Sequence, residues 1–278
     1  MIELSRRSHF TRRARPGPSR DVLTSGETKE LRALQTRSNR EARGRFLAEG
    51  VRVVEDLVAS PLRVRWAVAS SSCEDSPRAS RLLTDIVERE IPLRRIDDRE
   101  LAELAATDSP QGILAVAETP RFLLTDIPRP TSTPSVVLLL DGVQDPGNFG
   151  TLVRSAEAFG AVGVVALPGT VDPWNPKSVR ASAGSSFRVP VVQASWDECA
   201  GVLREMGFRL LGADTSGKPV AEMRGEAVGL VVGNEGSGLS VTVLAGLDGL
   251  VGIPLRGRAE SLNVAAAAAI LLHELSSG

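Results

Sequence analysis

The sequence predicts an α/β protein of two domains, the second of which contains a mostly parallel sheet. Three observations lead to this prediction. Short apolar runs alternate with amphipathic stretches along most of the 278 residues, which is the pattern of alternating strands and helices. Residues 136–140 are continuously apolar, as is typical of a strand buried on both faces of a parallel sheet. Residues 119–135 contain four prolines and separate two such patterns, and we interpret them as a semi-rigid linker with little to bury.

The first domain is expected between residues 27 and 118. Strands and helices are predicted to alternate there, in chain order, at residues 46–48, 51–59, 64–69, 78–89 and 112–117. Residues 1–26 precede it as a basic arm, because residues 1–20 hold six arginines against one glutamate and show no apolar period. Such a segment is expected to be disordered, and it is either merely solvated or an arm that attracts nucleic acid.

The second domain is expected between residues 136 and 278. Two helices are predicted at 148–159 and 262–275, the first ending at Gly160 and the second capped by Ser261. The predicted strands lie at residues 136–140, 162–167, 208–213, 228–232 and 250–253.

Composition excludes several classes of protein. No apolar run approaches the roughly 18 residues that a membrane span needs, and the basic N-terminus lacks the apolar core of a secretory signal. The two cysteines and two histidines are far apart and lack metal-ligand spacing. We therefore expect a cytoplasmic protein without a metal site or a membrane partner.

Two glycine-rich segments imitate nucleotide-binding motifs. Residues 212–218 have the spacing of a phosphate-binding loop, but Pro219 stands where a Ser or Thr must ligate magnesium. Residues 233–238 hold their glycines in the reverse of the dinucleotide-binding order. The sequence therefore does not favour an NTPase or a dehydrogenase.

Three other segments place polar residues and glycines directly after predicted strands. They are Asp141-Gly-Val-Gln-Asp-Pro-Gly-Asn148 with Arg154 beyond it, Gly233-Asn-Glu235-Gly-Ser-Gly, and Ile253-Pro-Leu-Arg-Gly-Arg-Ala-Glu-Ser261-Leu262-Asn263. Ligands of parallel α/β sheets bind at the carboxyl ends of the strands, so these turns are expected to converge on one pocket.

In their order along the chain and in their residues, these segments resemble the three signature motifs of the SpoU (TrmH-like) class of the SPOUT superfamily of knotted RNA methyltransferases. The resemblance covers residues 136–278, including the stretch Lys177-Ser-Val-Arg180-Ala-Ser-Ala-Gly184 between motifs. Residues 40–50 and 109–113 are similar to the family's N-terminal substrate-binding domain, which resembles small RNA-binding ribosomal proteins.

The resemblance implies an α/β fold with a C-terminal trefoil knot, a homodimer with a shared active site, and S-adenosylmethionine as the cofactor. The residues that match the family's cofactor-holding backbone positions are Gly233, Ile253 and Leu262. The residues that match its polar catalytic set are Asn148, Arg154, Glu235, Ser261 and Asn263. The implied reaction is methyl transfer to a ribose 2′-hydroxyl of RNA.

Five of these residues also have a purely structural interpretation. Arg154 could be a surface residue, Asn148 and Ser261 could cap helices, Gly233 could serve a tight turn, and Glu235 could favour a helix N-terminus. Within the enzyme interpretation, the family's usual proposal makes Arg154 the general base. Because a guanidinium does not readily lose its proton, we favour a clamp that grips phosphate and stabilises developing alkoxide charge.

Five arginines lie within fourteen residues near the start of the first domain, opposed only by Glu41, and are expected either to form a solvated helix face or to bind RNA phosphates. They are Arg32, Arg37, Arg40, Arg43 and Arg45. The expected RNA is ribosomal, most simply 23S rRNA at a guanosine or uridine. Transfer RNA, an antibiotic-resistance role on ribosomal RNA, base methylation, and a non-catalytic RNA-binding or ribosome-assembly factor are the alternatives.

Overall fold

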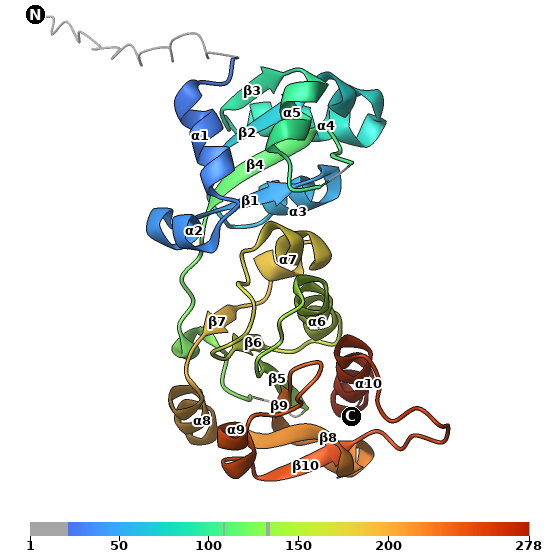
Figure 1. Cartoon of the computed structure of the whole chain (residues 1–278). Helices are drawn as coiled ribbons and strands as arrows, with labels where there is room; N and C mark the ends of the chain where they lie inside the picture. The colour runs from blue at the N-terminus through green and yellow to red at the C-terminus, as the bar shows by residue number, and fades with distance from the viewer. Residues whose placement is uncertain (1–21, 108, 132–133, 278) are drawn as a thin grey trace, which may run out of the picture.

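The computed structural model describes residues 22–107, 109–131 and 134–277 as two stacked α/β domains (Figure 1). Most of the predicted basic arm lies outside these ranges. Its predicted end at residue 26 is wrong, because Thr24 caps the first helix through a capping box with Glu27. Among the described helices, none combines the length and the apolar character that crossing a membrane requires.

The first domain is a mixed four-stranded sheet in the order β1-β4-β2-β3, with helices on both faces. Strand β4 pairs antiparallel with β1 and β2, and β3 pairs parallel with β2. Its elements are α1 (Ser25–Ala33), α2 (Arg37–Arg43), β1 (Arg45–Glu49), α3 (Val51–Ala59), β2 (Val64–Ser70), η1 (Ser71–Asp75), α4 (Pro77–Glu88), β3 (Leu93–Ile96), α5 (Asp98–Leu104) and β4 (Ile113–Glu118). The predicted elements are confirmed to within two residues, whereas α1, α2, β3 and α5 were not predicted.

The second domain is a six-stranded sheet in the order β10-β8-β9-β5-β6-β7, and every pair of neighbouring strands is parallel. Its elements are η2 (Leu124–Asp126), β5 (Ser135–Leu140), α6 (Pro146–Ala158), β6 (Gly163–Ala166), α7 (Pro176–Ala181), η3 (Ser185–Phe187), β7 (Val191–Gln193), α8 (Trp196–Glu205), β8 (Arg209–Pro219), η4 (Val220–Met223), β9 (Ala227–Val232), α9 (Val241–Ala245), β10 (Gly249–Gly252) and α10 (Val264–Ser276). The predicted parallel sheet is confirmed.

Both faces of this sheet are covered, which explains the continuous apolar run in β5. Val136, Leu138 and Leu140 pack with α6 and α10. Val137 and Leu139 point the other way and pack with α8 and α9. The linker packs against the side of the sheet that α8 and α9 cover, because Ile127 is buried there and only 2 % exposed. The expectation that the linker has little to bury is therefore wrong.

The two domains share a hydrophobic core. Trp174 and Phe187 of the second domain pack against Phe46 of β1, with ring centroids 4.7 and 5.9 Å away. Helix α7 accordingly lies directly beneath β1 in Figure 1. This packing fixes the first domain against the parallel sheet that carries the candidate site.

Candidate active site

The carboxyl ends of β9 and β10 and the segment that leads into α10 surround a pocket of about 620 Å³. Helix α6 contributes its first turn to the rim, because the turn between β5 and α6 lies beside the loop that follows β9. The pocket is lined by seven of the eight predicted catalytic and cofactor-binding residues: Asn148, Gly233, Glu235, Ile253, Ser261, Leu262 and Asn263. The predicted convergence of the three polar segments is therefore confirmed.

Asn148 links the other two motif segments through its side chain. Its amide nitrogen donates to a Glu235 carboxylate oxygen at 3.1 Å, and its amide oxygen accepts from the Asn263 side chain at 3.1 Å. Asn148 does not cap its helix, because α6 begins two residues before the predicted start and Asp145 caps it. The capping interpretation therefore fails for Asn148, and its side chain is available for the network.

Glu235 accepts hydrogen bonds from backbone as well as side chain. The amides of Gln144 and Asp145 each donate to its carboxylate at 3.2 Å. Burial acts to raise the pKa of Glu235, but the hydrogen bonds from Asn148 and the backbone outweigh it and leave the pKa below its ordinary value. The carboxylate is therefore held ionised and oriented at the pocket rim.

The backbone passes very close to itself at the base of the pocket. A Cβ on Gly233 would lie 2.3 Å from the carbonyl carbon of Gly238, and one on Gly252 would lie 2.6 Å from the carbonyl oxygen of Asp214. Larger residues would force these segments apart, so glycine is required to keep backbone donors and acceptors next to the cavity.

Several residues that line the pocket were not predicted as site residues, among them Asn234 and Asp214. Asn234 organises the loop after β9, since its side-chain oxygen accepts from the amides of Gly236 and Ser237 while its nitrogen donates to the Gly142 carbonyl. An Asn within a run of glycines and serine, as in residues 233–238, is a common turn former and was the available signal. Asp214 lines the pocket from β8, so the segment that imitates a phosphate-binding loop is part of a strand.

Ser261 does not cap the final helix. Helix α10 begins at Val264, and Asn263 caps it by accepting from the amides of Ala265 and Ala266. The predicted cap is therefore wrong. Ser261 is instead exposed in the segment between β10 and α10 that lines the pocket.

Arg154 lies apart from the other catalytic candidates. It is exposed on α6, does not line the pocket, and makes no ion pair or side-chain hydrogen bond with any of the described residues. Within one chain, therefore, the described contacts do not bring its guanidinium to Glu235 or Asn148.

The arginine cluster of the first domain divides into buried and exposed members. Arg40 is only 3 % exposed, pairs with Asp172 and donates to the Leu34 carbonyl, so its assignment to an RNA-binding surface is wrong. Arg45 is partly exposed and paired with Glu30. The exposed members are Arg32, Arg37 and Arg43, of which Arg37 pairs with Glu41.

Two family models match the chain. The model described as the SpoU rRNA Methylase family matches residues 135–273, which are half of the chain, and the model described as the MRM3-like substrate binding domain matches residues 26–115. These matches identify a methyltransferase domain preceded by a substrate-binding domain.

Several known proteins are similar to this chain over nearly its whole length. The 23S rRNA (guanosine(2553)-2′-O)-methyltransferase RlmP of Bacillus subtilis is 36% identical over 251 residues, covering 90% of this chain and 95% of that protein. A 23S rRNA (uridine(2479)-2′-O)-methyltransferase of Streptomyces viridochromogenes is 33% identical over 87% of this chain and 85% of that protein. The AdoMet complex of the SpoU methyltransferase AviRb from Streptomyces viridochromogenes has a TM-score of 0.79 at 32% identity, over 91% of this chain and 97% of that one. The chain belongs to the SpoU rRNA methylase family, which confirms the resemblance seen in the sequence.

Proposed function

We propose that the protein transfers the methyl group of S-adenosylmethionine to a ribose 2′-hydroxyl of 23S ribosomal RNA. The observation that carries this proposal is the pocket itself, where Asn148, Glu235 and Asn263 form one hydrogen-bonded chain beside a glycine-lined cavity. Both named relatives methylate a ribose 2′-hydroxyl of 23S rRNA. Ribosomal RNA as substrate implies a cytoplasmic reaction.

The pocket fits a nucleoside-bearing cofactor. Its volume of about 620 Å³ lies within the range of roughly 300–1,000 Å³ that is usual for small-ligand sites. Val251, Ile253 and Leu271 give it an apolar wall, and the close approach at Gly233 keeps bulky side chains out of the cavity. S-adenosylmethionine supplies an activated methyl group, so the protein has to position the hydroxyl, exclude water and manage one proton.

We assign these tasks to the polar set around the pocket. Glu235 provides an ionised carboxylate, oriented by Asn148, that can bind the guanidinium group of Arg154 through two hydrogen bonds. Ser261 and Asn263 orient the ribose or this network. Arg154 grips the phosphate beside the target ribose and stabilises the charge that develops on the 2′-oxygen, and the proton leaves late to phosphate or water.

A homodimer would bring Arg154 of one subunit to the pocket of the other. Arg154 is exposed on α6 and away from the pocket of its own chain. Helix α10 packs beside α6 and leaves Ile270 42 % exposed, which gives a second copy an apolar side chain to contact on the helix next to α6. We place the subunit interface on these two helices. The trefoil knot implied by the family resemblance stays a prediction.

Mapping 2′-O-methylation across total RNA, with and without the protein, tests the substrate assignment. We expect one 2′-O-methylated position of 23S rRNA to disappear when the protein is removed and to return with the wild-type chain but not with Arg154→Ala. Loss of a transfer RNA position with an unchanged 23S profile would favour the transfer RNA alternative. An unchanged profile everywhere would favour a non-catalytic assembly factor.

A further inference from the structure

The loop between β6 and α7 contacts both the substrate-binding domain and the catalytic turn. Toward the substrate-binding domain, Asp172 forms an ion pair with Arg40. The Nε atom of Arg40 lies 2.7 Å and its Nη2 atom 2.5 Å from one oxygen of Asp172, while the other oxygen accepts from the Trp174 amide at 3.0 Å. The Arg40 and Asp172 side chains are 3 % and 9 % exposed. The ion pair is therefore buried where the two domains meet.

Toward the methyltransferase sheet, the two residues before Asp172 bind the turn that leads from β5 into α6. The Val171 amide donates to the Val143 carbonyl at 2.8 Å. The Thr170 hydroxyl accepts from the Gly142 amide at 3.1 Å and donates to the Leu140 carbonyl at 2.8 Å. The position of the turn thus depends on the position of this loop.

The same turn positions the catalytic carboxylate. Gln144 and Asp145, which directly follow the residues bound by the loop, donate their amides to Glu235. Asp145 also caps the helix that presents Asn148. Only a few hydrogen bonds therefore separate the domain interface at Asp172 from the Asn148–Glu235 pair.

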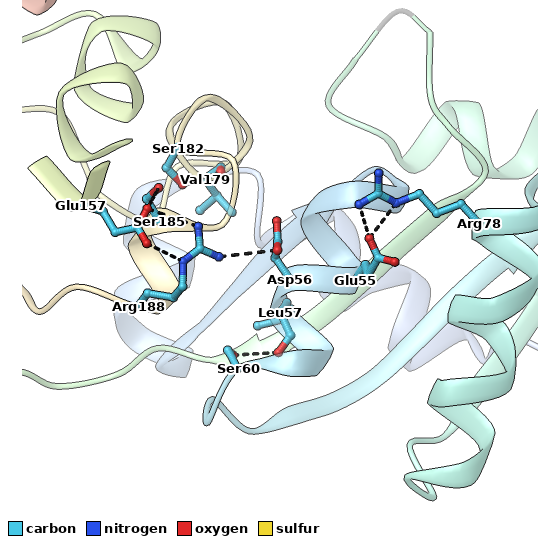
Figure 2. A network of polar contacts seen from close by, with 10 residues as sticks. All are labelled: Glu55, Asp56, Leu57, Ser60, Arg78, Glu157, Val179, Ser182, Ser185 and Arg188. Carbon is cyan, nitrogen blue, oxygen red and sulfur yellow. Dashed lines mark hydrogen bonds and ion pairs between the residues drawn. The ribbon is translucent and has the colours of Figure 1, made fainter. Parts of the chain in front are cut away.

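A second contact joins the substrate-binding domain to the far end of the same helix. Figure 2 shows Arg188 between Asp56 of α3 and Glu157 of α6. Its guanidinium lies 3.5 Å from the Asp56 carboxylate and 2.9 Å from that of Glu157, and Ser185 also donates to Glu157. Because this network is partly exposed, we expect it to contribute less than the buried Arg40–Asp172 pair to holding the two domains in place.

We propose that Asp172 is a positioning residue that couples the docking of the substrate-binding domain to the geometry of the catalytic turn. A buried ion pair adds little stability compared with apolar packing, but it tolerates few arrangements of its two partners. RNA held by the first domain is thereby presented to Asn148 and Glu235 at a fixed distance. This inference rests on the proposed methyltransferase function.

The variant that tests it replaces both members of the pair, Arg40→Met with Asp172→Asn. Removing one partner alone would leave a buried charge uncompensated and could unfold the chain. Met fills the space of the arginine stem, and Asn still accepts from the Trp174 amide. The matched control is Arg94→Met with Glu27→Gln, because that ion pair is also largely buried but lies within the first domain. The Gln retains the capping box of α1.

Two readouts are needed, hydrogen exchange of the peptide covering residues 141–148 and steady-state methylation of 23S rRNA. In the double variant we expect exchange at 142–145 to accelerate by at least about tenfold. We expect kcat to fall by about ten- to a hundredfold, with the Kd for S-adenosylmethionine and the KM for RNA each within about threefold of wild type. The control pair should change neither exchange at 142–145 nor kcat, even where it lowers the Tm.

A folded double variant with wild-type exchange at 142–145 and kcat within about twofold would overturn the proposal. Thr170→Val provides the test if the double variant does not fold, because it cuts the contact to the turn and leaves the ion pair in place. It should accelerate the same exchange and lower kcat, and wild-type values would again overturn the proposal. Hydrogen exchange does not depend on catalysis. An inactive wild-type protein would therefore count against the proposed function, while the exchange data would still decide the role of Asp172.

Discussion

The side-chain amide of Asn148 donates a hydrogen bond to the carboxylate of Glu235 at 3.1 Å, although 87 residues separate them in the chain. The parallel sheet creates this contact, because β5 and β9 are neighbours and both end at the same edge. With Asn263 donating to Asn148, one chain of hydrogen bonds joins all three motif segments.

Glu235 should remain ionised through the neutral and mildly acidic range. Its pKa is lowered in the folded state, so the stability it contributes is present above the unfolded value of about 4.3 and is lost as the pH falls through the lowered value. We expect the Tm difference between wild type and Glu235→Gln to stay constant from pH 8 to about pH 5 and to close only at lower pH. Closure of that difference between pH 7 and pH 6 would contradict the lowered pKa.

Arg154→Ala should abolish methylation and leave the Kd for S-adenosylmethionine nearly unchanged, because the proposed contact of Arg154 is with the phosphate beside the target ribose and not with the cofactor. Arg154→Lys should fail as well, since a point charge cannot reproduce a bidentate guanidinium fork. Single-turnover methylation and calorimetric titration of the cofactor measure the two effects. Near-normal turnover in the lysine variant would eliminate the clamp mechanism.

Mixing two inactive variants tests whether the active site is shared between subunits. Arg154→Ala keeps its pocket, whereas Gly233→Trp keeps its arginine but blocks a site where even a Cβ would clash with Gly238. Random reassortment into mixed dimers should restore roughly a quarter of the wild-type activity, because each mixed dimer contains one intact composite site. A fully active monomer by light scattering would show that the site is not shared.

The exposed arginines of the first domain should account for part of its affinity for RNA. Replacing Arg32, Arg37 and Arg43 by Ala should weaken RNA binding and flatten its salt dependence by up to about one unit of log–log slope per lost contact. Binding isotherms at several salt concentrations measure this, with cofactor affinity as the internal control. Wild-type affinity together with an unchanged slope would show that RNA binds elsewhere.

The burial of Arg40 could not be predicted from the sequence. Its spacing within a run of arginines looks like that of its exposed neighbours, and only the fold brings in Asp172, 132 residues further along the chain. Most strands and the helices α3, α4, α6 and α10 were predictable because their apolar periods are strong, and the predicted bounds of α3 at 51–59 are confirmed. The strands β3 and β7 and the helices α1 and α8 were not predicted. The short helices α2 and α5 carry few apolar residues and gave no such signal.

The candidate site was predictable to a similar extent. Strand ends and the family resemblance were enough to bring Asn148, Glu235 and Asn263 together. The roles of Asn234 and Thr170 were not predictable, because both depend on contacts with Gly142 in a different segment. Ser261 was misassigned as a cap because two good capping residues lie two positions apart, and only the backbone geometry selects Asn263.

The most direct test of the proposed function is the chemical identity of the methylated product. Purified protein is incubated with tritium-labelled S-adenosylmethionine and unmodified 23S rRNA, and the RNA is digested to nucleosides and separated. The proposal predicts label in a single 2′-O-methylnucleoside with wild type and none with Arg154→Ala. Label in a methylated base, or equal labelling by wild type and Arg154→Ala, would contradict it.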